Sequence, residues 1–221
     1  MTVFTLVMGN RASSSWSLRG WLALKCTGVA FDEAMVWFKR PDIKEQILTH
    51  SPSGLVPVLK HHKKDGDLLI WETLAIIEYL DELFPDAGLW PENQDARAVA
   101  RAVSAEMHGG FGLLRDHMPM DLQNHRPGEG QEKIKPPGVP ENIKRITAIW
   151  EDCRDRFGGG GDFLFGTLTA ADIMFAPVVT RFQTYGVELS PQVRKAAGQE
   201  RGEAGARRVT LVNTRPQGGR D

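Results

Sequence analysis

Cysteine, net charge and long apolar runs are all scarce in this chain. Its 221 residues include two cysteines, Cys26 and Cys153, far apart and outside any CxxC motif, which argues against a disulfide scaffold and a cysteine-based zinc site. The 27 Lys and Arg balance 28 Asp and Glu, so no charge footprint for nucleic acid or anionic membrane exists. No apolar run approaches the ~20 residues that span a bilayer, and Met1–Val7 lacks a signal-peptide pattern. We therefore expect a cytoplasmic protein with no metal and no nucleic-acid or membrane partner.

The first part of the chain alternates between strand and helix patterns. Strands are predicted at 3–8, 31–38, 55–59 and 68–71, and helices at 16–25, 41–49 and 74–83. The last two strands flank an Asp65-Gly66 turn signal, which indicates a hairpin. A parallel strand pair with a right-handed crossover, followed by a hairpin, gives one mixed four-stranded sheet.

From about Gln94 the strand pattern ends and helical spacing takes over. Helices are predicted at 96–117, 143–157 and 169–182, and the Pro- and Gly-rich segment 124–142 is predicted to be an irregular loop. Thr169 is followed three positions later by Asp172, the spacing of a reciprocal helix cap that serves folding. We expect a β/α unit over 1–85 followed by an all-helical unit over 93–190.

Residues 191–221 do not match the rest of the chain. They contain seven Lys and Arg, three Asp and Glu, five glycines and no aromatic residue. No sustained helical apolar stripe is visible, which favours a disordered tail. The alternative hypothesis is a sequence aberration, such as translation out of frame from about Pro191. Sequencing the gene would test it.

Two short segments could contribute to a ligand site. Pro57 interrupts a strand pattern, so it either lies in trans on an edge strand or forms a cis Val56-Pro57 bond that leaves the Val56 main chain free for a ligand. Glu72 and Thr73 open a helix directly after a strand. They are either an ordinary helix start, or a place where free N–H groups take a carboxylate while Glu72 pairs with an ammonium.

Ser13, Ser14, Ser15 and Ser17 cluster at the start of the first predicted helix. One interpretation is a helix cap with solvated neighbours, and the other is a hydroxyl that donates to a thiolate above the helix N-terminus. An ordinary thiol of pKa ~8.5 is only ~3% ionised at pH 7. A hydrogen bond to the charged sulfur contributes ~1.5–3 kcal/mol, and the helix dipole adds to it. A serine can therefore raise the thiolate fraction without a base or a metal.

Taken together, four segments resemble a glutathione transferase over about residues 3–190. The segments are Ser13–Arg19, Ser51–Leu59, Trp71–Leu80, and Gly166 with Thr169–Asp172 and Pro177. The resemblance implies an α/β plus all-α fold, with a thioredoxin-like N-terminal domain of βαβαββα order and a helical C-terminal domain. It also implies a homodimer that uses glutathione as co-substrate.

The resemblance further implies residues for each part of glutathione: Ser14 or Ser15 for the thiolate, Val56 and Pro57 for the cysteinyl main chain, Glu72 and Thr73 for the γ-glutamyl end, and Lys39 or Arg40 for the glycyl carboxylate. Ser14 is the first choice and Ser15 its nearest competitor. Leu55 stands where many members have a basic residue, which is why the carboxylate is assigned to Lys39 or Arg40.

The implied activity is conjugation of glutathione to small hydrophobic electrophiles, a detoxification reaction. His108, Phe111 and Arg115 are candidate residues of the acceptor pocket. The serine cluster is also similar to the zeta class, which includes maleylacetoacetate isomerases, but Trp16 stands at that class's cysteine and argues against isomerase chemistry. A non-catalytic glutathione-binding or regulatory protein and a glutathione-dependent isomerase or peroxidase are the alternatives. Cys26 and Cys153 are expected to be buried hydrophobes rather than nucleophiles.

Overall fold

The computed structural model describes residues 2–38, 41–191 and 193. Its first half contains β1 (Phe4–Met8), α1 (Ser15–Thr27), β2 (Phe31–Met35), α2 (Ile43–Leu48), β3 (Val58–Lys63), β4 (Gly66–Ile70) and α3 (Thr73–Leu83). The βαβαββα order confirms the prediction from the sequence. The strand predicted at 55–59 starts later than expected, because Pro57 precedes the strand instead of lying within it.

The four strands form one mixed sheet in the order β2-β1-β3-β4. β1 runs parallel to β2 and antiparallel to β3, with Leu6 opposite both Glu33 and Leu59. β3 and β4 form the predicted hairpin, which closes between Lys63 and Gly66. Because β1 lies at the centre of the sheet, its carboxyl end and the loop into α1 have neighbouring strands on both sides.

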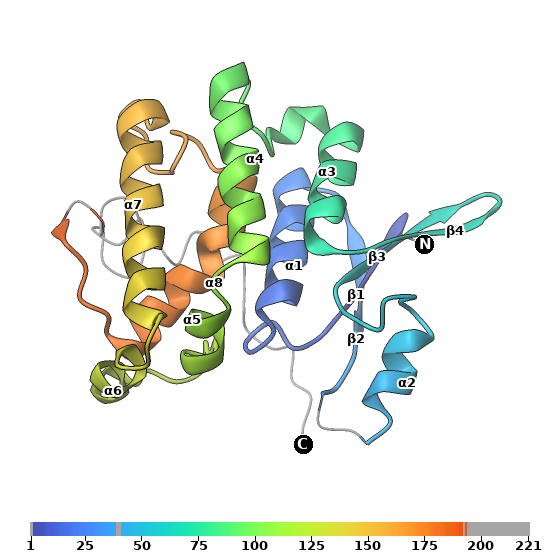
Figure 1. Cartoon of the computed structure of the whole chain (residues 1–221). Coiled ribbons are helices and arrows are strands. Elements are labelled where there is room, and N and C mark those ends of the chain that lie inside the picture. Colours follow the sequence, from blue (N-terminus) through green and yellow to red (C-terminus); the bar gives the residue numbers. More distant parts are fainter. Residues whose placement is uncertain (1, 39–40, 192, 194–221) are drawn as a thin grey trace.

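Helices cover both faces of this sheet (Figure 1). α2 lies on one face over a small apolar cluster of Val7, Val36, Ile47 and Val58. α1 and α3 lie on the other face, between the sheet and the helical half of the chain, and their buried side chains belong to a core that continues into that half. Trp21 of α1 is among the largest fully buried side chains, and burial of a side chain of this kind contributes roughly 1.5–3 kcal/mol.

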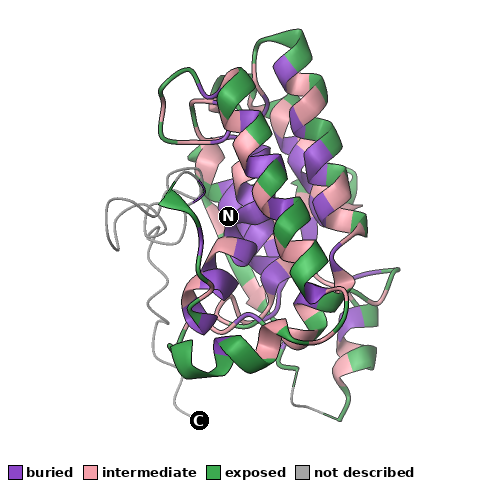
Figure 2. Cartoon of the chain, turned by 60° about the vertical axis from the view of Figure 1, so that its left-hand side comes forward, coloured by how far each residue is buried: buried purple, intermediate pink, exposed green. Residues whose placement is uncertain are grey.

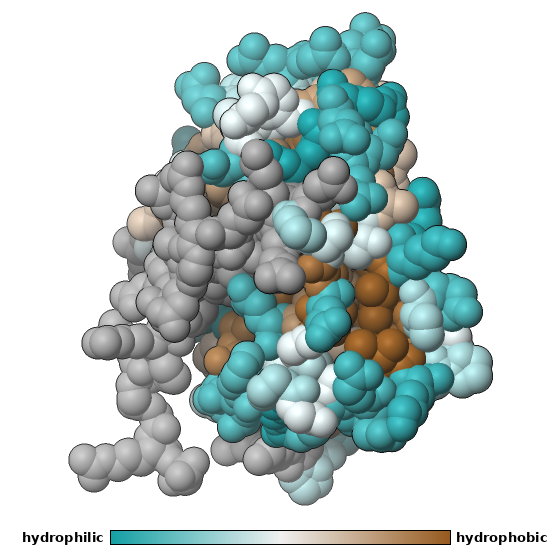
Figure 3. Space-filling model, turned by 90° about the vertical axis from the view of Figure 1, so that its left-hand side faces the viewer, coloured by the Kyte–Doolittle hydropathy of each residue, from teal (hydrophilic) through white to brown (hydrophobic). Residues whose placement is uncertain are grey.

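The second half is helical. It contains α4 (Gln94–Gly109), α5 (Gly112–His117), α6 (Gly130–Ile134), α7 (Val139–Phe157) and α8 (Ala170–Tyr185), with short 3-10 helices at Pro85–Ala87 and Pro127–Glu129. α8 lies at the centre and is buried along nearly its whole length. Figure 2 shows buried residues on the inward faces of the surrounding helices and exposed residues outside. The coloured atoms in Figure 3 are mostly hydrophilic, and the largest apolar area lies on the right of that view.

The prediction of a single helix over 96–117 is wrong, because the helix is interrupted in its middle. α4 ends at Gly109, Gly110 is extended, and Phe111 adopts a left-handed backbone with φ 58° before α5 begins. A Cβ on Gly110 would lie 2.7 Å from the carbonyl oxygen of Glu106, so this turn requires glycine. The break lets the chain turn between the two helices and brings Arg115 toward the start of α1.

The prediction of an irregular loop over 124–142 is also wrong, because part of this segment is helical. It contains α6 and the first turn of α7, which starts at Val139 with Pro140 in its first turn. Proline is tolerated there because the first N–H groups of a helix have no intrahelical partner. α8 extends to Tyr185, beyond the predicted end at Phe182, and stops where Gly186 takes a left-handed conformation.

The reciprocal cap at the start of α8 is confirmed. The carboxylate of Asp172 accepts the Thr169 N–H and the Thr169 hydroxyl, both at 2.9 Å, and the Leu164 N–H at 3.0 Å. Burial raises the pKa of Asp172 to about 6, although these hydrogen bonds oppose the shift. Asp172 thus links the loop before α8 to the first turn of that helix.

Of the predicted tail at 191–221, all but residues 191 and 193 lie outside the described part of the chain. The domain bounds at 1–85 and 93–190 remain a prediction. Within the described residues, no helix combines the length and apolar character that a membrane crossing needs.

Candidate active site

The serine cluster lies in the loop between the central strand β1 and α1. Ser14 is the N-cap of α1 and is half-buried, whereas Ser13 is exposed and Ser17 fully buried. The Ser14 hydroxyl accepts the Ser17 N–H at 3.4 Å and donates to Ser17 Oγ at 2.9 Å. Ser17 Oγ also accepts the Gly9 N–H at 2.9 Å, so it ties the end of β1 to the first turn of the helix and holds Ser14 in position.

Ser15, the competing candidate, has different surroundings. Only 8% of its surface is exposed, and its hydroxyl accepts a hydrogen bond from Nη2 of Arg181 on α8 at 3.4 Å. Ser15 therefore faces the helical half of the protein. Ser14 is the more accessible hydroxyl at the helix start, which favours the first choice made from the sequence.

The Val56–Pro57 peptide bond is cis. The β1–β3 ladder starts with Val7 opposite Val58, so the Val56 main chain lies outside it. Pro57 is buried against α1, where a Cβ on Gly20 would be 3.0 Å from the proline Cγ. Glycine at this position, which the motif analysis did not single out, lets α1 approach the segment before β3 closely.

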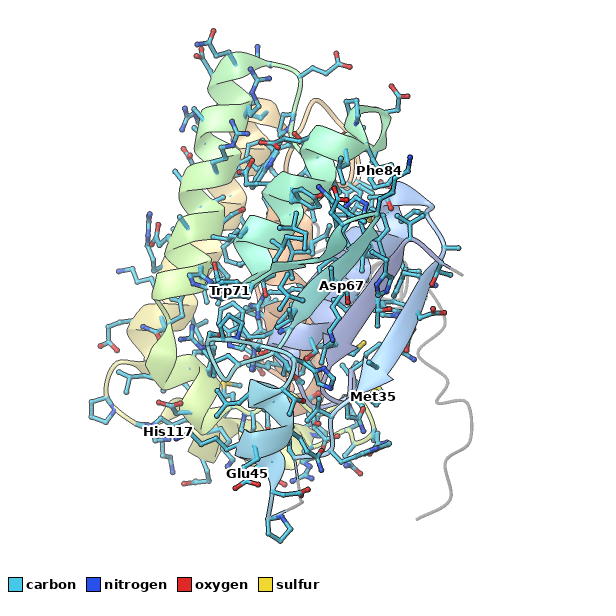
Figure 4. The ribbon with its side chains drawn as sticks, turned by 90° about the vertical axis from the view of Figure 1, so that its right-hand side faces the viewer. Met35, Glu45, Asp67, Trp71, Phe84 and His117 are labelled. Carbon is cyan, nitrogen blue, oxygen red and sulfur yellow. The ribbon has the colours of Figure 1, made fainter. Side chains whose placement is uncertain are left out.

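Glu72 and Thr73 lie where the chain passes from β4 into α3, next to Trp71 in Figure 4. Thr73 is buried, and its hydroxyl donates to the main-chain oxygen of Trp16 at 3.5 Å, which joins the starts of α3 and α1. The Glu72 carboxylate pairs with Nε2 of His108 at 2.9 Å. The structure thus brings the Glu72–Thr73 segment close to the serine loop.

Two of the three acceptor-pocket candidates meet at Trp16. The His108 ring lies 5.0 Å from the Trp16 ring, and the Arg115 guanidinium lies 5.6 Å from it. Phe111 is 8% exposed and belongs to the core. His108 and Arg115 therefore line the junction of the two halves beside the serine loop, while Phe111 serves packing.

Lys39 and Arg40, the candidates for the glycyl carboxylate, lie outside the described residues. Burial raises the pKa of Cys26 to about 11 and that of Cys153 to about 12. Both thiols are therefore protonated at neutral pH. Cys153 is buried as expected, whereas Cys26 is only half-buried. Among the described residues, no cluster of three His, Cys, Asp or Glu could hold a metal ion.

Sequence reasoning missed two buried arginines next to this site. Arg19 of α1 is fully buried, with its guanidinium 4.5 Å from the Trp16 ring, and its Nε donates to the Met174 carbonyl oxygen at 2.8 Å. Arg181 of α8 is 4% exposed, and its Nε donates to the Met118 carbonyl oxygen at 2.7 Å. A basic residue inside an otherwise apolar helical run was the signal that could have identified each of them.

Comparison with known proteins gives two family matches. Residues 13–83 match the glutathione S-transferase N-terminal domain, and residues 136–203 match the glutathione S-transferase C-terminal domain. Together they cover more than half of the chain. The second match extends past residue 190, where the tail was predicted to begin.

Two curated relatives are similar to most of the chain. The chain is 29% identical to a probable maleylacetoacetate isomerase of Caenorhabditis elegans over 82% of this chain and 79% of that protein. It is 25% identical to a stringent starvation protein A homolog of Pasteurella multocida, over 76% of this chain and 71% of that protein.

Two crystal structures share the fold. A glutathione transferase homolog from Burkholderia with bound glutathione superposes with a TM-score of 0.65 at 20% identity, covering 96% and 97% of the two chains. A maleylacetoacetate isomerase from Anaeromyxobacter dehalogenans, with bound dicarboxyethyl glutathione and citrate, gives 0.63 at 24% identity over 95% of each chain. With both domain models matched in order on this fold, the chain belongs to the glutathione S-transferase family.

Proposed function

We propose that the protein binds glutathione at the start of α1 and conjugates it, through its sulfur, to small electrophiles. The observation that carries the proposal is the position of Ser14. It is a half-buried helix cap whose hydroxyl is hydrogen-bonded to Ser17. The start of α1 is joined to the Glu72–Thr73 segment by the hydrogen bond from the Thr73 hydroxyl to the Trp16 main-chain oxygen. Family membership supports glutathione as the co-substrate.

Three main-chain and side-chain groups would bind the tripeptide. The Val56 N–H and C=O, outside the β1–β3 ladder, would pair with the cysteinyl main chain in the manner of an added strand. The start of α3 would take the γ-glutamyl carboxylate at its free N–H groups, and Glu72 the ammonium. With the tripeptide bound in this way, the sulfur would lie above the N-terminus of α1.

In the reaction the Ser14 O–H donates to the sulfur and stabilises the thiolate. Ser17 supports this, because its own hydroxyl can donate to Ser14 Oγ once Ser14 turns its proton toward the ligand. The thiolate attacks the electrophilic carbon with its lone pair and forms a C–S bond. On an aryl halide, the halide leaves with the electron pair of the broken bond.

A second candidate is a glutathione-dependent isomerase, which the similarity to maleylacetoacetate isomerases favours. In that reaction the thiolate adds and leaves again, so glutathione is regenerated. Product analysis separates the two: a stable thioether indicates transfer, whereas an isomerised acceptor with unchanged glutathione indicates isomerisation. A glutathione-dependent peroxidase would instead yield oxidised glutathione.

The test is conjugation of glutathione to 1-chloro-2,4-dinitrobenzene by the wild type and by Ser14→Ala, with glutathione affinity measured by calorimetry. We expect turnover in the wild type, and loss of most turnover with retained glutathione binding in Ser14→Ala. Binding without turnover on a panel of electrophiles would instead indicate a non-catalytic glutathione-binding or regulatory protein. No glutathione binding at all would contradict the proposal.

We also propose, from family membership, that the protein is a homodimer located in the cytoplasm. Light scattering coupled to gel filtration tests the first point, because a dimer has twice the mass of the 24.5 kDa chain. Cell fractionation tests the second.

A further inference from the structure

Three guanidinium groups from three different helices converge on the start of α1. Arg19 comes from α1, Arg115 from α5 and Arg181 from α8. The guanidinium carbons of Arg19 and Arg115 lie 4.5 and 5.6 Å from the Trp16 ring, and Nη2 of Arg181 lies 3.4 Å from Ser15 Oγ. We call these three residues the arginine cluster.

The arginine cluster has unused donors. Nη1 and Nη2 of Arg19 and Nη1 of Arg181 are buried without a hydrogen-bond partner among the described residues, although Arg19 is fully buried and Arg181 is 4% exposed. Among the residues that the structure describes, no carboxylate forms an ion pair with any of the three arginines. Buried charges without a counter-charge are costly, so the cluster is incomplete without an anion.

The charges of the cluster act on one another. Burial, and after it the charges of Arg181 and Arg115, lower the pKa of Arg19 well below its usual value. Burial and the Arg115 charge lower the pKa of Arg181 to about 10, so this group remains charged at neutral pH. An anion nearby would relieve this repulsion, and the positive end of the α1 dipole adds attraction at the same place.

We propose that the anion is the ionised sulfur of glutathione, and that the arginine cluster is a positioning and charge-stabilising device behind the serine loop. This inference rests on the proposed function. The contact between Arg181 and Ser15 joins the cluster to the residue adjacent to Ser14, the residue at which the sulfur is proposed to bind. The thiol releases its proton to water, the sulfur keeps the electron pair, and the cluster lowers the free energy of the resulting anion.

The size of the effect depends on the distance between the arginines and the sulfur. If that distance is about 8 Å, then at an effective dielectric constant of about 20 one positive charge lowers the pKa of the thiol by roughly 1.5 units. Ser14 acts by direct contact, whereas the arginines act through space and through Ser15. The two contributions are therefore separable by substitution.

The experiment measures the pKa of glutathione bound to the enzyme, from the ultraviolet absorbance of its thiolate as a function of pH. The variants are Arg115→Met, which removes a half-buried charge, Arg181→Met, and Arg181→Lys, which keeps the charge. Arg156→Gln is the matched control, since Arg156 is an exposed arginine of α7 paired with Asp152. Circular dichroism establishes which variants fold.

We expect the thiol pKa to rise by about one unit in Arg115→Met and Arg181→Met, and to stay near the wild-type value in Arg181→Lys and Arg156→Gln. The pH at which turnover reaches half its maximum should rise equally. If Arg181→Met does not fold, Arg115→Met and Arg181→Lys still decide the question.

An unchanged thiol pKa in a folded Arg115→Met enzyme that binds and conjugates glutathione would overturn the inference and leave the proposed function standing. Loss of turnover confined to acid-bearing electrophiles, at unchanged thiol pKa, would also overturn it and assign the cluster to the acceptor. If the wild type does not bind glutathione, the proposed function fails and this inference fails with it.

Discussion

Oε2 of Glu72 lies 2.9 Å from Nε2 of His108, across the junction between the sheet-bearing half and the helical half. The carboxylate proposed to meet the ammonium of glutathione is therefore already paired with a side chain of α4. Both side chains are partly exposed, with fractions of 43% and 35%. The pair is weak enough for a ligand to displace His108.

We predict that His108→Phe tightens glutathione binding up to about fivefold. The substitution removes the competitor for Glu72 but keeps an aromatic ring against Trp16, and exposed ion pairs are worth ~0.2–1 kcal/mol. Titration calorimetry measures the change. Glu72→Gln is the control and should weaken binding by about tenfold or more. Weaker binding in His108→Phe would mean that His108 holds Glu72 in its binding position.

Ser14→Ala should lower turnover more than Ser15→Ala does. Loss of the Ser14 hydroxyl removes a hydrogen bond to a charged sulfur worth ~1.5–3 kcal/mol, which corresponds to about a 10- to 150-fold drop in turnover. It also removes the α1 cap, at a cost of ~1 kcal/mol in unfolding free energy. Ser15→Ala should lower turnover less, since that hydroxyl faces Arg181. Steady-state kinetics with saturating glutathione would show the reverse order if Ser15 held the thiolate.

Asp172→Ala should destabilise the fold without affecting the chemistry. Its half-buried carboxylate accepts three hydrogen bonds, and unsatisfied buried donors cost ~1–3 kcal/mol each. We expect a loss of about 2 kcal/mol or more in urea unfolding, with kcat per folded molecule close to the wild type. Unchanged stability combined with lower turnover would assign Asp172 a catalytic role instead.

The same carboxylate gives stability a specific pH dependence. Burial raises the pKa of Asp172 from 3.8 in the unfolded chain to about 6 in the folded protein. The contribution is therefore fully present below pH 3.8 and is lost as the pH rises through about 6. The unfolding free energy of the wild type minus that of Asp172→Asn should fall by about 2 kcal/mol between pH 4 and 7. A difference independent of pH would contradict the raised pKa.

Neither cysteine should react in the folded protein. The pKa values of about 11 for Cys26 and about 12 for Cys153 leave almost no thiolate at pH 7. We expect negligible labelling by iodoacetamide in buffer and labelling of both thiols in urea, as read by mass spectrometry. Fast labelling of either thiol in the native state would identify it as a reactive cysteine.

The order of elements in the first half could be predicted because its signals are local. Short apolar runs and helical spacing marked the strands and helices, and the Asp65-Gly66 turn marked the hairpin. In the second half, the Thr169–Asp172 spacing marked the start of α8 in the same local way. The break between α4 and α5 was missed, since glycines inside a helical pattern only lower helix propensity. The left-handed Phe111 that completes the turn leaves no trace in the spacing.

The sequence by itself determined the family, through four motifs in order, and the short segments that could bind glutathione. Only the tertiary structure decided that Ser14 is accessible while Ser15 faces Arg181, that Glu72 pairs with His108, and that Arg19, Arg115 and Arg181 meet. The physical reason is the distance along the sequence over which each contact forms. Motifs report contacts within a few residues, whereas the arginine cluster joins helices separated by most of the chain, and its contacts exist only once α8 packs against α1.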